Sequence, residues 1–326
     1  MNSAQTHSPV AHQGIFTGSN ALQLFYQSWY PNLATALPSN AVAVKGVLVL
    51  VHGLGEHSGR YCNVVKALTA AGYAVYAFDN QGHGRSEGQR GHINRWQDYR
   101  NNIRYFLQLV RQQEPTAPLF LMGHSLGGLI VLDYVLRSSA LRSDGTALSN
   151  QDHPQEHSEA SGSEFAALNL VGIVVSAPPI QPAKGTASSV RIMIARLLSG
   201  LLPRLPLKMG LDKKGLSRSS EAIEDLVDDP LIHPYVTLRW GSETLKTIAW
   251  VKANIDRLCL PILLTHGDAD PIIAPAGSYE IFQQIPTPNK TLTLYPGSYH
   301  EPHNDLDADV VTTDLVNWLN KCVAAA

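Results

Sequence analysis

Short apolar segments alternate with amphipathic helical segments along most of this chain, and that alternation restricts the folds open to it. The segment at 46–51 (GVLVLV) is apolar at every position after its glycine, as expected for a strand buried on both faces of a sheet. Similar apolar runs occupy 73–78, 119–122, 172–175 and 262–265. Two sets of apolar residues recur between them at helical spacing: Tyr61, Val64, Val65 and Leu68, then Ile103, Phe106, Leu107 and Val110. The pattern predicts an α/β fold, with a mostly parallel sheet covered by helices on both faces.

Two long segments interrupt this alternation. Residues 138–167 are polar and rich in serine, which predicts a flexible surface insertion. Residues 180–250 instead contain apolar positions at helical spacing, followed by prolines that end the helix; these positions are Val190, Ile194, Leu197 and Leu201, then Pro203 and Pro206. Because this segment lies between two predicted core strands, we interpret it as a cap domain. The predicted organisation is a flexible tail (1–13), a core (14–179 and 251–326) and the inserted cap (180–250).

Composition excludes several classes of protein. The 25 Lys and Arg nearly balance the 27 Asp and Glu, so the chain offers no basic surface for nucleic acid. No apolar run approaches the roughly 18–20 residues that span a bilayer, and the polar N-terminal segment lacks the apolar core of a secretory signal. Cys62, Cys259 and Cys322 lie too far apart for a disulfide framework or a zinc knuckle. We expect a soluble, cytoplasmic protein that binds no nucleic acid.

A candidate nucleophile lies directly after one of the predicted strands. The hexapeptide at 123–128 (GHSLGG) follows the apolar run 119–122 and precedes a helical segment rich in leucine and isoleucine. Its pattern, G-x-S-x-G, is typical of a tight strand-to-helix turn that holds the serine in a strained backbone conformation. The pentapeptide alone is a weak signal, and its position between a strand and a helix is what makes Ser125 the candidate.

A serine hydroxyl needs further groups before it attacks a carbonyl near neutral pH. An imidazole must take its proton, and a carboxylate must fix the tautomer of that imidazole and stabilise its cation. In a sheet of this kind the acid and then the histidine follow the serine along the chain, each at the end of a strand. The segments at 261–270 (PILLTHGDAD) and 291–300 (TLTLYPGSYH) have this order and this placement.

Each of these two segments offers a choice. Asp270 is favoured over Asp268 because Pro271 begins a new turn there, whereas Asp268 also suits a role in capping the turn through backbone N–H groups. His300 is favoured over His303 because it closes the predicted strand, while His303 lies further along the loop.

Acyl transfer also needs two N–H donors aimed at the oxygen on which negative charge develops. One donor comes from the residue after the nucleophile, here Leu126, and the other from a loop after an early strand. The segment at 52–57 (HGLGEH) follows the strand at 46–51, and glycines on both sides of Leu54 allow its N–H to turn inward. We therefore expect the oxyanion hole at the N–H groups of Leu54 and Leu126.

Several segments together resemble the monoacylglycerol lipase/lysophospholipase (serine aminopeptidase S33-like) branch of the α/β-hydrolases, over roughly residues 14–322. They are HGLGEHSGRY at 52–61, FDNQGHGRSEG at 78–88, GHSLGG at 123–128, GDAD at 267–270 and GSYH at 297–300. In the predicted cap, LPRL at 202–205 and DPLI at 229–232 resemble segments of monoglyceride lipases. The set is far more specific than any one of its members.

The resemblance implies an α/β-hydrolase fold with an inserted cap, and a serine hydrolase that cleaves monoacylglycerols or similar single-chain esters. It assigns Ser125 as the nucleophile, Asp270 as the acid and His300 as the base. Leu54 and Leu126 match the family's oxyanion donors. The positions that match polar residues near the glycerol-binding end of that family are Glu56, Arg60 and His303.

Alternatives on the same scaffold stay open: another carboxylesterase, an acyltransferase, a peptidase, or a ligand-binding protein without catalysis. The apolar residues of the predicted cap, with arginines among them, suit an acyl-binding surface and a transient contact with a membrane surface. The pattern H-x-x-E-H at 153–157 lies in a serine-rich stretch with a proline beside its first histidine, so we expect no metal site there. We expect a small lipid or ester substrate and neither a metal nor an organic cofactor; the oligomeric state is left open.

Overall fold

The computed structural model describes residues 10–31, 44–138, 165, 168–183, 199–209 and 213–325. Its main strands are β1 (Val10–Thr17), β2 (Gln23–Tyr30), β3 (Val47–Val51), β4 (Ala74–Phe78), β5 (Leu119–His124), β6 (Leu170–Ser176), β9 (Ile262–Gly267) and β10 (Lys290–Tyr295). They form one 8-stranded sheet in the order β1-β2-β4-β3-β5-β6-β9-β10. β2 is antiparallel to both β1 and β4, and every other neighbouring pair is parallel. The mostly parallel sheet predicted from the sequence is confirmed.

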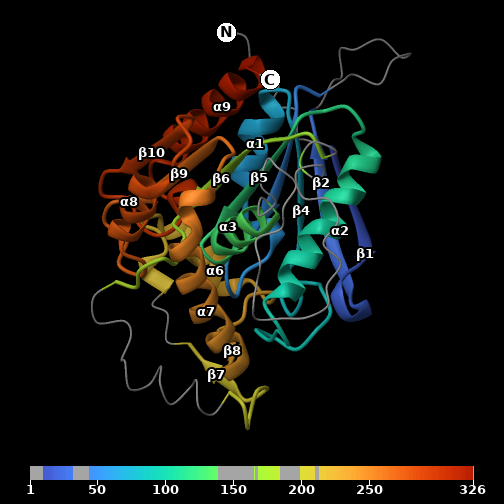
Figure 1. Cartoon of the computed structure of the whole chain (residues 1–326), viewed down its shortest axis with the longest axis vertical. Helices are drawn as coiled ribbons and strands as arrows, with labels where there is room; N and C mark the ends of the chain where they lie inside the picture. Colours follow the sequence, from blue (N-terminus) through green and yellow to red (C-terminus); the bar gives the residue numbers. More distant parts are fainter. Residues whose placement is uncertain are drawn as a thin grey trace.

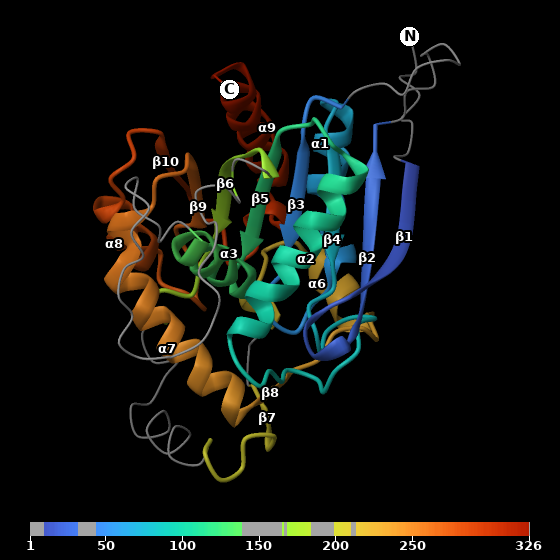
Figure 2. The same ribbon diagram turned by 45° about the vertical axis from the view of Figure 1, so that its right-hand side comes forward.

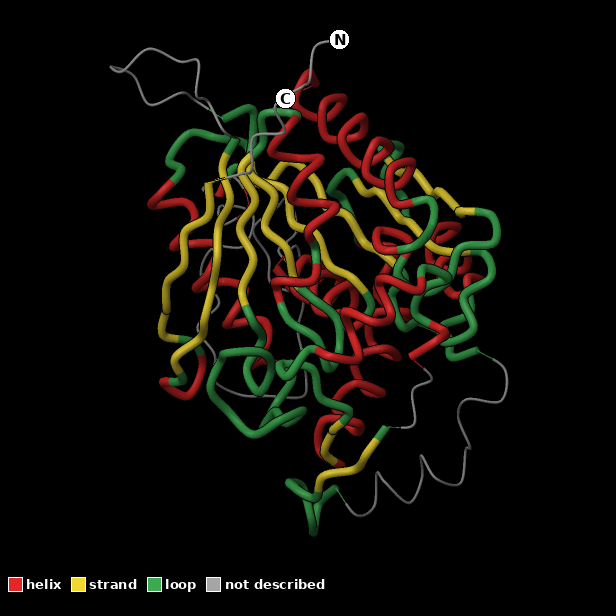
Figure 3. Tube along the Cα trace, turned by 180° about the vertical axis from the view of Figure 1, so that it is seen from behind, coloured by secondary structure: helices red, strands yellow, loops and turns green. Residues whose placement is uncertain are grey.

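Helices cover both faces of this sheet (Figures 1 and 3). α1 (Cys62–Ala70) and α9 (Ala308–Ala325) pack on one face. The other face carries α2 (Gln97–Gln113), α3 (Leu126–Ser138), α7 (Leu238–Asn254) and α8 (Pro275–Gln284). Seen from behind, the strands turn progressively across the sheet, as the right-handed twist of β-strands requires (Figure 3).

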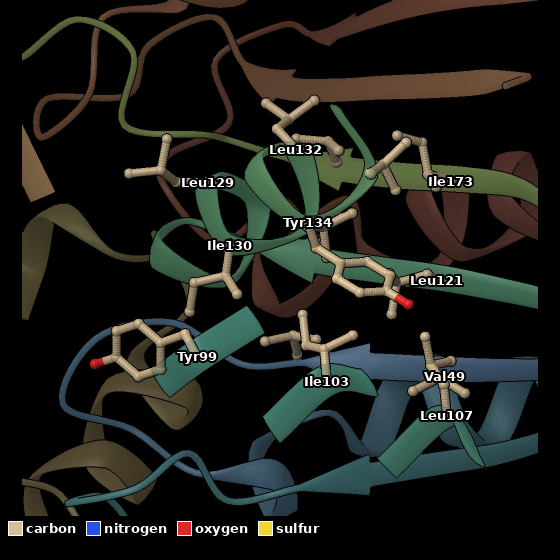
Figure 4. Packing of buried hydrophobic residues seen from close by; sticks show 14 of the residues in the cluster. Val49, Tyr99, Ile103, Leu107, Leu121, Leu129, Ile130, Leu132, Tyr134 and Ile173 are labelled. Atoms are coloured by element: carbon tan, nitrogen blue, oxygen red, sulfur yellow. The ribbon is translucent and has the colours of Figure 1, made fainter. Parts of the chain in front are cut away.

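The continuous apolar runs in the sequence are explained by burial on both faces. In β3, Val47, Val49 and Val51 pack with α2 and α3, whereas Leu48 and Leu50 pack with α1 and α9. Figure 4 shows the first of these layers, in which α2 and α3 meet the strands through interlocking aliphatic side chains and Tyr134. Each such side chain contributes about 1.5–3 kcal/mol through burial, so the core holds the strand ends at fixed positions.

The order of the strands reverses direction at β3. The chain passes from β3 to its neighbour β4 and then across to β5 on the opposite side of β3. Loops that leave two adjacent parallel strands in opposite directions open a crevice at their carboxyl ends, which is where open α/β sheets bind ligands. The arrowheads of β3 and β5 point toward the end of the molecule where α7 begins (Figure 2).

The predicted cap supplies several elements beyond the carboxyl ends of the strands. They are β7 (Pro206–Lys208), α6 (Ser220–Asp228) and β8 (Tyr235–Thr237), with β7 and β8 paired antiparallel. The predicted boundary at residue 250 falls inside α7. The C-terminal half of that helix packs on the core, since Val251 is buried there and the Arg137 guanidinium of α3 lies 3.7 Å from the centre of the Trp250 ring. Positions 190, 194 and 197 of the predicted cap helix and most of the predicted insertion, including 153–157, lie outside the described residues.

The predicted flexible tail is wrong at its C-terminal end, because residues 10–13 belong to β1. Among the described strands, β1 lies at the edge of the sheet and pairs with β2, and its Phe16 is buried, packed on Phe78 and Phe106. An edge strand that buries so little shows weak alternation in its sequence, which is why β1 was not predicted. β2 lies between β1 and β4, but most of its residues are only partly buried, so its sequence lacks a continuous apolar run as well.

Candidate active site

Ser125 occupies the turn between β5 and α3 in a left-handed backbone conformation, with φ of 51°. A side chain rarely adopts this conformation without external restraint. The N–H of Ser125 donates to the Ser176 carbonyl oxygen on β6 at 2.8 Å. A Cβ atom on Gly127 would lie 2.0 Å from the Val51 carbonyl oxygen, because the start of α3 passes directly against the end of β3. The turn therefore requires glycine at 127, and it presents the Ser125 hydroxyl at the crevice.

The structure brings the three predicted residues together in one line. The Ser125 hydroxyl lies 2.9 Å from Nε2 of His300, although 175 positions separate them in the chain. Nδ1 of His300 lies 2.6 Å from Oδ2 of Asp270. Asp268 instead accepts a hydrogen bond from the Gly297 N–H at 2.6 Å and is exposed, so it caps the turn and makes no bond to His300.

Asp270 is held by more groups than the sequence indicated. Its Oδ1 accepts the N–H groups of Ile272 at 2.8 Å and Ile273 at 3.0 Å. Its Oδ2 lies 3.0 Å from Nε2 of His266, whose other ring nitrogen bonds Ser278 at 2.7 Å. Burial alone would raise the pKa of Asp270, but the charge of His300 and these donors lower it well below its usual range. His266 was missed by the sequence analysis, although it lies four residues before Asp270 at the end of the same strand.

The imidazole of His300 is tuned to accept a proton. Burial alone would lower its pKa, but the adjacent Asp270 carboxylate raises it above the usual histidine value. Two further imidazoles lie near it: the His124 ring is centred 5.0 Å from that of His300, and His303 packs on His124 at 4.9 Å. Burial lowers the pKa of His124, and it lowers that of His303 to about 4, so both rings are neutral near neutral pH.

His303 packs beneath the site rather than in it. Its ring stacks on Tyr61 with centres 4.8 Å apart and planes within 6°. Neither ring nitrogen has a hydrogen-bond partner among the described residues. His303 does not line the cavity into which Ser125 opens. Its contact with the glycerol end of a substrate therefore stays a prediction that this geometry does not support.

The predicted oxyanion donors lie beside the nucleophile. Leu54 and Leu126 line the same cavity as Ser125, and within the described residues the N–H of neither makes a hydrogen bond. Glu56 fixes the loop that carries Leu54, because its Oε1 accepts the Gly53 N–H at 2.6 Å and the Tyr61 hydroxyl at 2.8 Å. The stabilisation of an oxyanion by these two N–H groups stays a prediction.

Arg60 joins the two sides of the site through buried carboxylates. Its Nε donates to Glu56 at 3.2 Å, and its Nη2 donates to Glu301 at 2.6 Å. Burial and the neighbouring Glu301 raise the pKa of Glu56. Burial would also raise the pKa of Glu301, but the charge of Arg60 lowers the pKa of Glu301 below its usual value. Glu56 and Glu301 line the cavity and Arg60 does not, so Arg60 lies behind the surface that a substrate would touch.

The loop that carries His300 is held by a segment of the predicted cap. The Leu216 carbonyl oxygen accepts the Glu301 N–H at 2.8 Å. Asp305 accepts the Tyr299 N–H at 2.7 Å and the Arg218 N–H at 2.8 Å, and its carboxylate also pairs with the Arg218 guanidinium at 3.0 Å. The sequence analysis did not single out Asp305 or Arg218, because the two approach each other only in the folded chain.

The serine opens into a cavity of about 560 Å³. Its floor contains Ser125, His300 and the two buried carboxylates, while its walls are mainly apolar and come largely from the predicted cap and α7. Besides Leu54 and Leu126, the apolar lining residues are Pro179, Met209, Leu216, Leu226, Ile232, Pro234, Tyr235, Trp240, Ile272 and Ile273. A volume of this size is typical of sites for small organic ligands.

Two further properties bear on the predictions from composition. Within the described ranges, no cluster of three or more His, Cys, Asp or Glu side chains is placed to hold a metal ion. In the same ranges, each helix is too short or too polar to cross a membrane.

Comparison with known proteins identifies the family. A family model described as serine aminopeptidase, S33, matches residues 42–151 and 163–307, well over half of the chain. The chain belongs to the serine aminopeptidase S33 family. This S33 chain has the α/β-hydrolase fold, and the resemblance found in its motifs is confirmed.

Relatives of this S33 chain include a monoacylglycerol lipase of Mycolicibacterium smegmatis, 30% identical over 93% of this chain and 95% of the relative. A monoglyceride lipase of Rattus norvegicus is 30% identical over 86% of this chain and 84% of the relative. Among solved structures, a Paleococcus ferrophilus monoacylglycerol lipase is 29% identical with a TM-score of 0.71, covering 97% of this chain and 100% of that one. A soluble variant of the monoglyceride lipase of Saccharomyces cerevisiae, in complex with a substrate analogue, is 24% identical with a TM-score of 0.75, covering 98% of each chain.

Proposed function

We propose that this chain is a serine hydrolase of carboxylic esters that cleaves monoacylglycerols or similar single-chain esters. The observation that carries the proposal is the bonded series Ser125–His300–Asp270, with 2.9 Å and 2.6 Å between its polar atoms, at the floor of an apolar cavity. The relatives named as monoacylglycerol and monoglyceride lipases support the same class of substrate.

The proposed reaction proceeds in two acyl transfers. The Ser125 hydroxyl attacks the ester carbonyl while Nε2 of His300 takes its proton, and Asp270 stabilises the resulting imidazolium. The N–H groups of Leu54 and Leu126 bind the oxygen on which negative charge develops. His300 then gives the proton to the leaving alcohol. In the second transfer, water attacks the acyl-enzyme while His300 takes its proton. The bond between the acyl group and the Ser125 oxygen then breaks, His300 returns the proton to that oxygen, and the fatty acid leaves.

The charges around the cavity favour an ester over the N-terminus of a peptide. The ammonium group of an aminopeptidase substrate is attracted most strongly by a carboxylate that has no other cation beside it. Among the described residues that line the cavity, the carboxylates are Glu56 and Glu301, and Arg60 already pairs with both. The apolar walls suit an acyl chain, whose burial contributes about 0.8 kcal/mol for each CH₂ group.

A substrate series tests the proposal. Wild-type enzyme is offered monoacylglycerols of increasing chain length, the matching p-nitrophenyl esters, a lysophospholipid, and an aminoacyl amide. We expect kcat/KM to rise with chain length and to be highest for monoacylglycerols. A preference for the aminoacyl amide over every ester would overturn the assignment in favour of a peptidase. Absence of turnover combined with no labelling of Ser125 by a fluorophosphonate would favour a ligand-binding protein without catalysis.

A transient contact with a membrane surface extends this proposal. In β7 and the segment just before it, Leu201 and Leu202 are 79% and 50% exposed, and Leu205 and Leu207 are also exposed. Arg204, in the middle of this group, is exposed too. Exposed aliphatic side chains combined with a basic residue suit the interface of a lipid bilayer, where a single-chain ester resides. These side chains support a contact that is peripheral to membranes, and the cytoplasmic location stays a prediction from the sequence.

The double variant Leu201→Ser/Leu202→Ser is expected to bind phospholipid vesicles about tenfold more weakly, because it removes apolar surface that the bilayer would bury. Cosedimentation with vesicles measures this binding. Turnover of a dissolved short-chain ester should not change. Val310→Ser, at an exposed position on α9, is the matched control and should bind vesicles like the wild type. Equal binding by all three proteins would exclude this contact surface.

A further inference from the structure

The loop at 52–57, which carries Leu54, is fixed on one side by the core of the molecule. Nε2 of His52 accepts the Asn80 N–H at 2.9 Å, so the start of the loop is tied to the segment that follows β4. The Gly53 N–H donates to Glu56 at 2.6 Å, which closes the loop on itself. These bonds hold the backbone before and after Leu54, and they come from outside the predicted cap.

The same loop is fixed on its other side by the segment between α6 and β8. The His233 N–H donates to the Gly55 carbonyl oxygen at 3.0 Å, one residue after Leu54. A Cβ on Gly55, which has φ of +75°, would lie 2.5 Å from the His233 carbonyl oxygen, so the two backbones are in direct contact. Two residues further along, Nε2 of His57 donates to Oδ2 of Asp229 at 2.6 Å.

Both members of the second contact are oriented by further bonds. Nδ1 of His57 accepts the Gly59 N–H at 3.1 Å, which leaves the proton on Nε2, facing Asp229. The other oxygen of Asp229 accepts the Leu231 N–H at 2.8 Å. Their side chains are only 11% and 21% exposed, so water competes little for this bond. A charge-assisted bond with both partners oriented holds its geometry more firmly than an exposed pair.

We propose that Asp229 is a positioning residue that sets the direction of the Leu54 N–H through His57, so that the oxyanion hole is complete only when segment 229–233 is seated on the loop. This rests on the proposed function, in which Leu54 is an oxyanion donor. The cap then does more than enclose the acyl chain, because its contact with the loop contributes to the transition state of the reaction. A loop that is free to turn donates a weaker hydrogen bond to the developing charge.

The test is Asp229→Ala beside Asp228→Ala, which removes the neighbouring exposed carboxylate at the end of α6. Three quantities are measured with a monoacylglycerol substrate: kcat, the inhibition constant of an acyl trifluoromethyl ketone, and the Kd of a monoalkyl glyceryl ether. The ketone forms a tetrahedral adduct whose oxygen occupies the oxyanion hole, whereas the ether reports ground-state binding only. We expect Asp229→Ala to lower kcat about tenfold and to weaken the ketone by a similar factor, with the Kd of the ether within about twofold of wild type.

Two further variants separate positioning from folding. Asp229→Asn keeps one acceptor oxygen for either His57 or Leu231, so we expect intermediate values and an unchanged Tm. His57→Ala should lower kcat and weaken the ketone to a similar extent as Asp229→Ala. The double variant should be little worse than either, because both single variants already lose the same bond between His57 and Asp229. The proposal is overturned if Asp229→Ala behaves like Asp228→Ala, or if the ether and the ketone are weakened equally. Loss of the proposed function itself would instead appear as full turnover by a variant that lacks Ser125.

Discussion

Ser125→Ala is expected to lower kcat for a monoacylglycerol by about 10⁶-fold, because the substitution removes the atom that attacks the ester while the rest of the site stays in place. The hydroxyl is the group bonded to Nε2 of His300, and Ser125 has no other side-chain atom that alanine lacks. Steady-state hydrolysis measures the loss, and fluorophosphonate labelling of the variant should be absent.

The structural control for this variant is its thermal unfolding. Alanine keeps the Cβ atom and the left-handed backbone at position 125, and the N–H bond to Ser176 is retained, so Tm should stay within a few degrees of wild type. Hydrolysis within about tenfold of wild type by a folded Ser125→Ala protein would remove Ser125 as the nucleophile, and with it the proposed mechanism.

Asp270→Asn is expected to lower kcat by about 10⁴-fold, because it reverses the tautomer of His300. The backbone N–H groups of Ile272 and Ile273 hold Oδ1, so an asparagine would keep its oxygen there and present its NH₂ group to His300. Nδ1 of His300 would then accept a hydrogen bond instead of donating one. The ring proton would move to Nε2, facing Ser125, and the base could no longer take the hydroxyl proton.

The pH profile of the same pair of proteins gives an independent measurement. Catalysis needs neutral His300, whose pKa Asp270 raises, so the acid limb of wild-type kcat/KM should lie above the usual histidine pKa of about 6.5. Activity is lost as the pH falls through this limb. In Asp270→Asn, whose carboxylate no longer stabilises the imidazolium, the limb of the residual activity should move to lower pH.

Asp268→Asn is the matched control for both measurements. Asp268 caps the turn by accepting the Gly297 N–H, and an asparagine oxygen accepts the same bond. We expect kcat and the acid limb to be close to wild type. A larger loss in Asp268→Asn than in Asp270→Asn would reverse the choice between the two acids.

Local signals were sufficient to predict much of this molecule. β3 and β5 are buried on both faces, and a strand in that position must be apolar throughout, so its sequence identifies it. The turn at Ser125 requires glycine at 127, because a Cβ there would clash with the Val51 carbonyl oxygen. The sequence shows this requirement as the G-x-S-x-G motif. β1 and β2 were missed because an edge hairpin buries one face weakly and carries little of this pattern.

The contacts made by residues near His300 could not be predicted from local sequence patterns. Glu56, Arg60 and His303 were assigned to substrate contact by resemblance. Glu56 lines the cavity, whereas Arg60 is held between two carboxylates behind the cavity wall and His303 is stacked on Tyr61. Both arrangements depend on partners from the loop after β10 meeting partners from the loop after β3. A single sequence carries no local pattern for a pairing across some 240 positions.

The sequence by itself determined the α/β class and the strand-to-helix turn that presents Ser125, because each follows from burial periodicity or from a turn of a few residues. The order of serine, acid and histidine was instead expected from the resemblance to the α/β-hydrolases. Only the tertiary structure decided between Asp268 and Asp270, added His266 and Asp305 to the site, and tied the Leu54 loop to Asp229. Those outcomes are set by distances between segments remote in the chain, and such distances are fixed by how the helices pack on the sheet.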